Sequence, residues 1–162
     1  MKILFIAYDN DSHIAYFPLG YAYLAAVCEK AGHEVIIYQQ DTHHWPDEHL
    51  TKYLDENDFD VVGLGASAGY YQYKRVIALS KAINQSINRP FFVLGGHIVT
   101  PEPEYFLQKT SADAIIMGEG ELIICKLLSV ISRNGDLAEV DGIAYMKESE
   151  IVINNLHLGK RE

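Results

Sequence analysis

The sequence predicts an α/β fold, a doubly wound sandwich of the flavodoxin or Rossmann type with a five-stranded parallel sheet and a short C-terminal β-hairpin. Three observations predict it. Five short apolar runs alternate with longer helical stretches. Each run is almost continuously apolar, which is typical of strands covered on both faces of a parallel sheet. Right-handed crossovers then leave few alternative topologies.

The elements follow in order along the chain. The expected strands are residues 3–7, 35–38, 61–65, 91–94 and 114–117. The expected helices are residues 19–32, 46–58, 71–86, 100–110 and 120–135. After residue 135 the pattern changes, and residues 142–155 predict two short strands around a polar turn.

Local signals support the helices. Gly32 suits the position after a helix C-terminus, and Pro46 with two acids after it suits an N-terminus. In the third helix, residues 76, 79 and 83 place apolar side chains on one face. In the fourth, Thr100 is the expected N-cap and Pro101 the first helical residue.

Composition limits the class of protein. The 162 residues predict one domain, and the formal net charge of -9 argues against binding nucleic acid or an anionic membrane surface. Two cysteines without paired spacing predict free thiols in a reducing compartment. The N-terminal apolar run is too short for a signal peptide, and no run reaches a membrane span. We therefore expect a soluble, cytoplasmic protein.

Three of the four loops that follow strands one, three, four and five are rich in glycine, alanine or serine. The four loops cover residues 9–20, 65–71, 95–100 and 118–121, and in doubly wound folds such loops share the ligand-binding edge of the sheet. Small residues let a ligand approach the backbone, although tight strand-to-helix turns also use glycine. The dinucleotide fingerprint and the P-loop motif are both missing. Several such loops together favour a large ligand.

Motifs along nearly the whole chain resemble one family. They are "MKILFIA", "PLGYAYLAAVCEKAGHEV", "DVVGLGAS", "VLGGHIVTPEPE", "ADAIIMGEGE" and "VDGIAYMKESEIVINN". In this order and spacing they resemble the N-terminal cobalamin-binding domain of cobalamin-dependent radical S-adenosylmethionine enzymes. "AGHEV" alone also occurs in glycosyltransferase N-terminal domains, so the N-terminal half of a two-domain glycosyltransferase is the alternative.

The resemblance implies that the chain holds cobalamin base-off, with the nucleotide tail detached from cobalt and buried between sheet and helices. It implies that residues 66–70 line the tail, that residues 95–96 let the nucleotide pass, and that residues 118–120 flank its ribose and phosphate. The residues expected at the cofactor are His13, Tyr16, Phe17, Gly65, Ala66, Ser67, Ala68, Gly69, Tyr70, Gly95, Gly96, His97, Ile98, Gly118, Glu119 and Gly120.

Two departures from the family pattern bear on function. His97 stands where the family commonly has proline, and it is either a ligand contact or a capping or solvent-facing residue. The radical domain needs a C-x-x-x-C-x-x-C site for its [4Fe-4S] cluster, whereas Cys28 and Cys125 lie far apart. We therefore expect no catalytic residue here. The cluster and S-adenosylmethionine belong to a parent methyl-transfer or related enzyme, whose radical domain lies in cis or in trans. Residues 1–138 are the expected cobalamin-binding domain, and residues 139–162 the hairpin and a linker.

Histidines raise the remaining metal question. A second cobalamin-binding class carries D-x-H-x-x-G, in which the histidine coordinates cobalt. Here Asp11 and His13 fit its start, but Tyr16 replaces the glycine. His13 is thus either a cobalt ligand held by Asp11 or an exposed loop residue. The cluster at residues 41–49 is either a divalent-cation site or, as we favour, a solvated loop.

Overall fold

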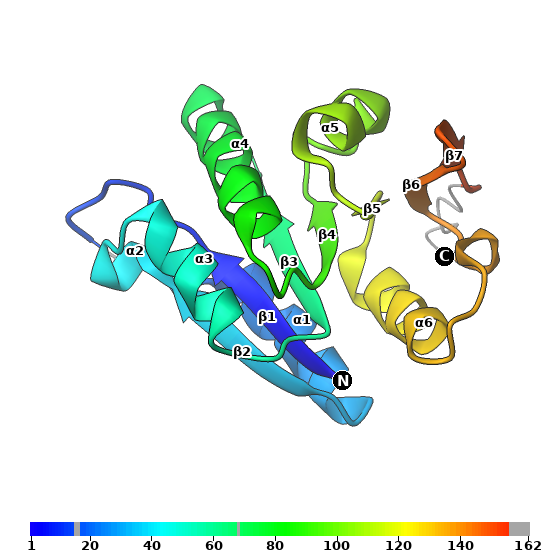
Figure 1. Cartoon of the computed structure of the whole chain (residues 1–162), viewed down its shortest axis with the longest axis horizontal. Coiled ribbons are helices and arrows are strands. Elements are labelled where there is room, and N and C mark those ends of the chain that lie inside the picture. The colour runs from blue at the N-terminus through cyan, green and yellow to red at the C-terminus, as the bar shows by residue number, and fades with distance from the viewer. Residues whose placement is uncertain (15–16, 68, 156–162) are drawn as a thin grey trace, which may run out of the picture.

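A computed structural model describes residues 1–14, 17–67 and 69–155 of the chain (Figure 1). Its centre is one seven-stranded sheet in the order β2-β1-β3-β4-β5-β6-β7. The strands are Lys2–Ala7 (β1), Glu34–Gln39 (β2), Val61–Gly65 (β3), Phe91–Gly95 (β4), Ala114–Ile116 (β5), Ile143–Lys147 (β6) and Glu150–Ile153 (β7). Strands β1 to β5 are parallel, which confirms the predicted parallel sheet.

The strand order explains where a ligand can enter. The parallel part runs 2-1-3-4-5, which is the flavodoxin-like order. The winding direction reverses between β1 and β3, so the crossovers on either side of this point cover opposite faces of the sheet. The loops there diverge and leave a crevice at the carboxyl ends of the strands.

The C-terminal hairpin is part of the sheet. Strand β6 pairs antiparallel with β5, Ile116 opposite Ile143, and β7 pairs with β6. The predicted hairpin is confirmed. Its two antiparallel strands join the five parallel strands in one seven-stranded sheet instead of standing apart from them. The buried Ile143, Ala144 and Tyr145 explain this, because they extend both apolar faces of β5: Ala144 joins one core, and Ile143 and Tyr145 join the other.

The helices cover both faces of the sheet. They are Leu19–Lys30 (α1), Gln40–His43 (α2), Asp47–Asp55 (α3), Tyr70–Gln85 (α4), Pro103–Thr110 (α5) and Gly120–Ser132 (α6), with a 3-10 turn at Leu137–Glu139. Figure 1 shows α3 and α4 in front of the sheet and α1 behind it. α1 packs beside α6, whereas α4 packs between α3 and α5.

Two apolar cores lie on the two faces. Leu4 and Ile6 of β1 face the core under α3, α4 and α5, while Ile3 and Phe5 face the core under α1 and α6. Successive strand residues point to opposite faces, so a strand between two cores must be apolar at every position. Among the described residues, no helix combines the length and apolarity needed to cross a membrane.

The predicted start of the fourth helix is wrong. α5 begins at Pro103, residues 97–101 form turns, and the Thr100 hydroxyl donates to the Gly96 carbonyl at 3.1 Å instead of capping a helix. The cause is the second proline. A residue that precedes proline is disfavoured in the helical region, and Glu102 before Pro103 is held at φ -132°.

Candidate functional site

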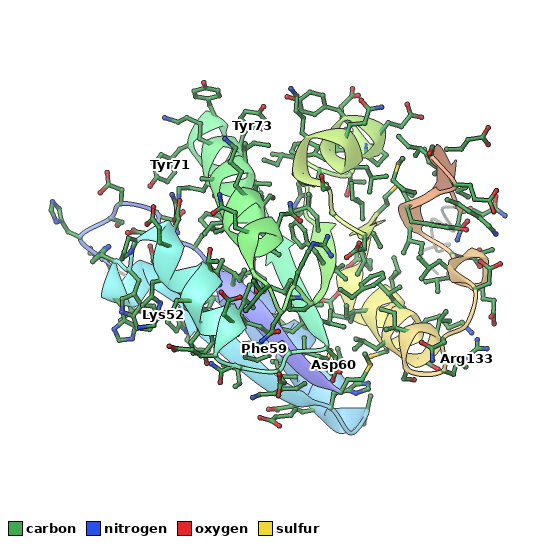
Figure 2. The ribbon with its side chains drawn as sticks, viewed as in Figure 1. Lys52, Phe59, Asp60, Tyr71, Tyr73 and Arg133 are labelled. Atoms are coloured by element: carbon green, nitrogen blue, oxygen red, sulfur yellow. The ribbon has the colours of Figure 1, made fainter. Side chains whose placement is uncertain are left out.

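A groove of about 660 Å³ opens at the carboxyl edge of the parallel strands. It lies between the sheet and the helices α1 and α6, and the loops after β1, β3, β4 and β5 form its rim. Figure 2 shows Tyr71 and Tyr73 near this edge, at the start of α4, whereas Phe59 and Asp60 lie toward the opposite edge. The groove therefore sits at the crevice where the strand order reverses.

Glycines leave the floor of the groove without side chains. Gly65 and Gly95 are register partners on β3 and β4, so they share one face of the sheet, and Gly63 lies two residues before Gly65 on that same face. A Cβ added at Gly65 or Gly95 would have its nearest neighbour at 3.5 Å, so both positions have room for one. At Gly63 an added Cβ would lie 2.6 Å from Phe5 Cδ1, because that ring lies over the bare backbone.

The inner walls of the groove are apolar. Leu24 of α1 and Ile124 of α6 face strand residues Phe5, Val93 and Ile116 across it. Tyr21 of α1 stacks on the Phe5 ring with centroids 5.7 Å apart. Its hydroxyl accepts a hydrogen bond from the Gly65 N–H at 2.8 Å, and burial raises the pKa of Tyr21. Tyr21 is therefore a neutral phenol fixed across the end of β3.

The rim of the groove is polar and acidic. Its polar side chains are Tyr8, Asn10, Asp41, Ser67, Gln72, His97, Thr100, Glu119 and Glu121. No lysine or arginine side chain lines it among the described residues. α1 and α6 both begin at this rim, so backbone N–H groups of their first turns face it. A negatively charged group bound at the rim would therefore meet backbone amides instead of cationic side chains.

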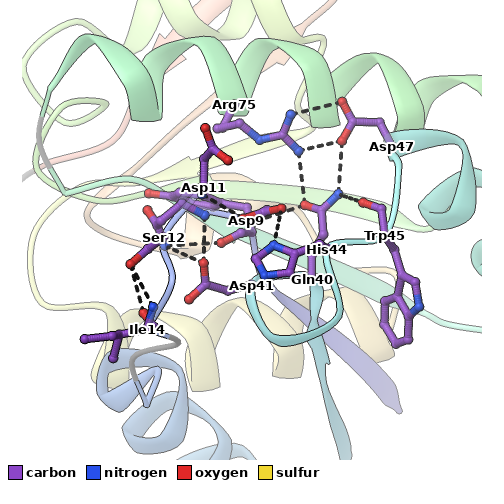
Figure 3. A network of polar contacts seen from close by, with 12 residues as sticks. Asp9, Asp11, Ser12, Ile14, Gln40, Asp41, His44, Trp45, Asp47 and Arg75 are labelled. Carbon is purple, nitrogen blue, oxygen red and sulfur yellow. Dashed lines mark hydrogen bonds and ion pairs between the residues drawn. The ribbon is translucent and has the colours of Figure 1, made fainter.

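The loop after β1 is docked onto α2 by buried polar groups (Figure 3). Asp41, only 4% exposed, accepts from the Asn10 N–H at 2.7 Å. Gln40, fully buried, accepts from the Asp9 N–H at 3.3 Å and from Arg75 Nη2 at 3.1 Å. These bonds hold the first residues of the loop at the edge of the groove.

An ion pair adds to this attachment. His44 Nδ1 lies 2.8 Å from Asp9 Oδ2. The hydrogen bond that His44 donates to the Asp9 carboxylate raises the pKa of His44. Burial raises the pKa of Asp9, but hydrogen bonds from His44 and from the Asp11 N–H outweigh it, and the Asp9 pKa lies below its usual value. Each group therefore favours the charged form of the other.

The segment at residues 41–49 ends α2, forms a short loop at residues 44–46 and begins α3. The His43 and His49 rings both stack on the Trp45 ring, with centroids 4.2 and 4.4 Å from it. The Tyr38 hydroxyl forms a hydrogen bond with His49 Nδ1. No group of three or more potential ligands that could hold a metal ion occurs in the described part of the chain. The expectation of a solvated loop agrees with the exposed His44, between α2 and α3, but not with Asp41, which is buried in the polar network.

His13 lies outside the groove lining. Its side chain is exposed, and no hydrogen bond or ion pair joins it to another described residue. The Asp11 N–H donates to Asp9 Oδ1 at 2.7 Å, and no hydrogen bond or ion pair joins the Asp11 and His13 side chains among the described residues. Coordination of cobalt by His13 stays a prediction. Tyr16 and Ala68 lie outside the described residues.

Most of the other residues expected at the cofactor line the groove. They are Phe17, Gly65, Ala66, Ser67, Gly95, Gly96, His97, Gly118, Glu119 and Gly120. Gly69, Tyr70 and Ile98 do not line it: Tyr70 is 73% exposed and stacks on Tyr73, and Ile98 packs against the core under α4. Their role at a cofactor is a prediction that this geometry does not support.

Gly96 has a structural role as well as a place in the groove. Its φ is +103°, and an added Cβ would lie 2.2 Å from the Ala66 carbonyl oxygen. The loops after β3 and β4 therefore touch backbone to backbone at this point. Only glycine fits here, whether or not a ligand is bound.

Sequence reasoning missed the inner groove. Phe5, Tyr21, Leu24, Val93 and Ile124 read as ordinary core residues in strands and helices. One signal was available for the floor: Gly63 and Gly65 alternate in β3, which removes both side chains from one face of a central strand.

The fold and groove define an α/β ligand-binding domain of the doubly wound class. The family model "B12 binding domain" matches residues 6–128. The chain belongs to the B12-binding domain family, which confirms its resemblance to cobalamin-binding domains. The glycosyltransferase alternative is not supported by this match.

The relatives that the chain matches are longer proteins. It is 30% identical to the uncharacterized methyltransferase PH0819 of Pyrococcus horikoshii, over 93% of this chain and 34% of that protein. It is 24% identical to the anaerobic magnesium-protoporphyrin IX monomethyl ester cyclase of Synechocystis, over 83% of this chain and 27% of that protein. The chain thus spans about a third of the first of these relatives and less of the second.

Solved structures share the fold. The radical S-adenosylmethionine methyltransferase TsrM of Kitasatospora setae, solved with cobalamin and a [4Fe-4S] cluster, superposes with a TM-score of 0.80 at 21% identity, covering 97% of this chain and 29% of TsrM. The cobalamin-dependent radical enzyme OxsB, solved with aqua-cobalamin and S-adenosylmethionine, gives 0.80 at 22% identity, covering 95% of this chain and 22% of OxsB.

Proposed function

We propose that this chain holds cobalamin base-off for a radical S-adenosylmethionine enzyme that performs methyl transfer or related chemistry. The observation that carries the proposal is the floor without side chains at Gly65 and Gly95, where an added Cβ has room, in a member of the B12-binding family. A doubly wound fold needs glycine in its turns. It has no structural need for paired glycines at Gly65 and Gly95, on one face of two central strands. The missing side chains make room for a flat ligand.

The residues present fit the parts of cobalamin. The glycine floor and the apolar walls suit an aromatic base, since they bury it between sheet and helices. The polar rim offers carboxylates, such as Glu119, and loop amides to the corrin amides and the tail phosphate. When bound, the cofactor supplies the cobalt-centred chemistry, and the chain supplies position and exclusion of water.

The rest of the enzyme lies outside this sequence. The two cysteines, Cys28 and Cys125, are both free and cannot form a three-cysteine cluster site. We propose a radical domain in cis, as the greater length of the relatives supports, with residues 139–162 leading toward it. The free thiols and the net charge of -9 support a cytoplasmic protein whose partner is not nucleic acid.

A binding experiment tests the proposal. The protein is mixed with hydroxocobalamin and desalted, and its visible spectrum is recorded. We expect the chromophore to be retained with a base-off spectrum, and a colourless protein would sink the proposal. Gly95→Leu, which places a side chain on the floor at a position with ordinary φ, should lower affinity tenfold or more, about 1.4 kcal/mol. Ala26→Leu on the exposed face of α1 is the control and should bind like wild type.

A further inference from the structure

The groove divides into two chemically distinct parts. The polar side chains of its rim all come from the loops and first helical turns at the carboxyl edge. The inner part is formed by Phe5, Val93 and Ile124, which are 2%, 4% and 2% exposed, together with Leu24 and Ile116. None of these five side chains carries a hydrogen-bonding group.

The Tyr21 hydroxyl and the Gly65 backbone, which border the inner part, are already paired with each other. The Tyr21 hydroxyl accepts from the Gly65 N–H and directs its own proton toward the Gly65 carbonyl at 3.4 Å. Gly63 and Val93 are register partners within the parallel sheet, where backbone groups bond along the ladder. A ligand group that enters the inner groove therefore finds surface to pack on and few hydrogen-bond partners.

We propose that this inner groove selects the base at the end of a cobamide tail and prefers a benzimidazole to a purine. The inference rests on the proposed function, since it concerns the same groove. Dimethylbenzimidazole is mostly hydrocarbon and, once detached from cobalt, exposes one ring nitrogen. Adenine carries an exocyclic amine and several ring nitrogens, and each loses its water on entering the groove.

The size of the preference follows from unpaired polar groups. A buried donor or acceptor without a partner weakens binding far more than a hydrogen bond lost in water does. Sites lacking a partner for one such group discriminate by roughly tenfold or more. We therefore expect cobalamin to bind at least about tenfold more tightly than the same cobamide with adenine as its base.

The test measures three dissociation constants on the 162-residue chain. The ligands are cobalamin, the adenine cobamide and cobinamide, which lacks the nucleotide tail. We expect the order cobalamin, adenine cobamide, cobinamide from tightest to weakest. Failure of cobalamin to bind overturns the proposed function and this inference with it. Tight cobalamin binding with equal affinity for the adenine cobamide, or for cobinamide, overturns this inference alone.

A matched pair of variants assigns the preference to the inner groove. Leu24→Gln places an amide on the half-buried wall, where it can pair with adenine, and should reduce the affinity ratio severalfold. Leu122→Gln makes the same change on α6 at a side chain that is 81% exposed and outside the lining, and should leave the ratio unchanged. The ratio compares two ligands on one folded protein, so a general loss of stability cancels. An unchanged ratio in Leu24→Gln would overturn the assignment.

Discussion

At Gly96, the loop after β4 lies directly against the loop after β3. Its positive φ of +103° and the 2.2 Å from an added Cβ to the Ala66 oxygen both exclude a side chain. We expect Gly96→Ala to lower the free energy of unfolding by about 1–3 kcal/mol, because both strain and a backbone clash must be relieved. Urea denaturation followed by circular dichroism measures it.

Gly20 supplies the control for this prediction. It lies in the first turn of α1, an added Cβ would meet nothing within 4 Å, and its φ is not positive. Gly20→Ala should leave stability unchanged or raise it by up to about 1 kcal/mol, through helix propensity. Equal loss of stability in both variants would contradict the account of Gly96.

The Asp9–His44 pair predicts a pH dependence with a definite sign. The raised pKa of His44 means that its contribution is full below the unfolded value of about 6.5 and is lost as pH rises through the folded pKa. The lowered pKa of Asp9 means that its contribution is lost as pH falls below about 3.8. We therefore expect the stability difference between wild type and His44→Asn to be largest near pH 5 and smallest near pH 9. Asparagine tolerates the left-handed backbone at this position, where φ is 51°.

His33 should behave in the opposite way. Burial and the N-terminal ammonium group lower its pKa, so the unfolded chain binds the proton more readily. The stability of wild type relative to His33→Asn should fall as pH drops below about 6.5. Urea denaturation of wild type and His33→Asn across this pH range measures the stability of each. If the two stability curves stay parallel, the role assigned to His33 is refuted.

At the scale of elements, one arginine joins three helices. Arg75 of α4 bonds Asp47 of α3 at 2.5 Å and Gln40 of α2 at 3.1 Å, and the side chains of the ion pair are 19% and 28% exposed. We expect Arg75→Met to cost about 1–3 kcal/mol, because partly buried partners lose a charged hydrogen bond. The amides of Asp9 and Asn10, held through Gln40 and Asp41, should also exchange hydrogen faster.

A surface pair provides the comparison. Lys52 and Glu56 lie 3.6 Å apart on one helical face with side chains 73% and 61% exposed. Lys52→Met should change stability by less than about 0.5 kcal/mol. If Arg75→Met costs no more than Lys52→Met, or leaves hydrogen exchange at Asn10 unchanged, the network does not hold the loop.

The same scale shows what sequence patterns can predict. All five parallel strands and all the longer helices follow from apolar runs, since burial on two faces imposes a pattern that is visible locally. α2 does not, because four residues are too few for periodicity and its polar Gln40 and Asp41 are buried only through partners distant in sequence. The start of α5 was missed because Pro103 outweighs the capping signal at Thr100.

At the scale of the molecule, one part of the site can be predicted from the sequence and another part cannot. The loops at the carboxyl edge are predictable, because the strand order of a doubly wound sheet brings them together. The inner groove is not, since its walls come from β1, α1, β4, β5 and α6 and consist of residues that any core would contain. Only the packed structure separates side chains that fill the core from those that line a space.

The hairpin bears on how the whole molecule unfolds. β6 pairs with β5, and Ile143 is fully buried in the core under α1 and α6. We expect the chain to unfold in one transition and Ile143→Ala to lower its free energy of unfolding by about 2–5 kcal/mol. Ile153→Ala on β7, where the residue is 49% exposed, should cost less than about 1 kcal/mol. Were residues 139–162 to fold apart from residues 1–138, Ile143→Ala would leave the main transition unmoved, and a second, earlier transition would carry the loss.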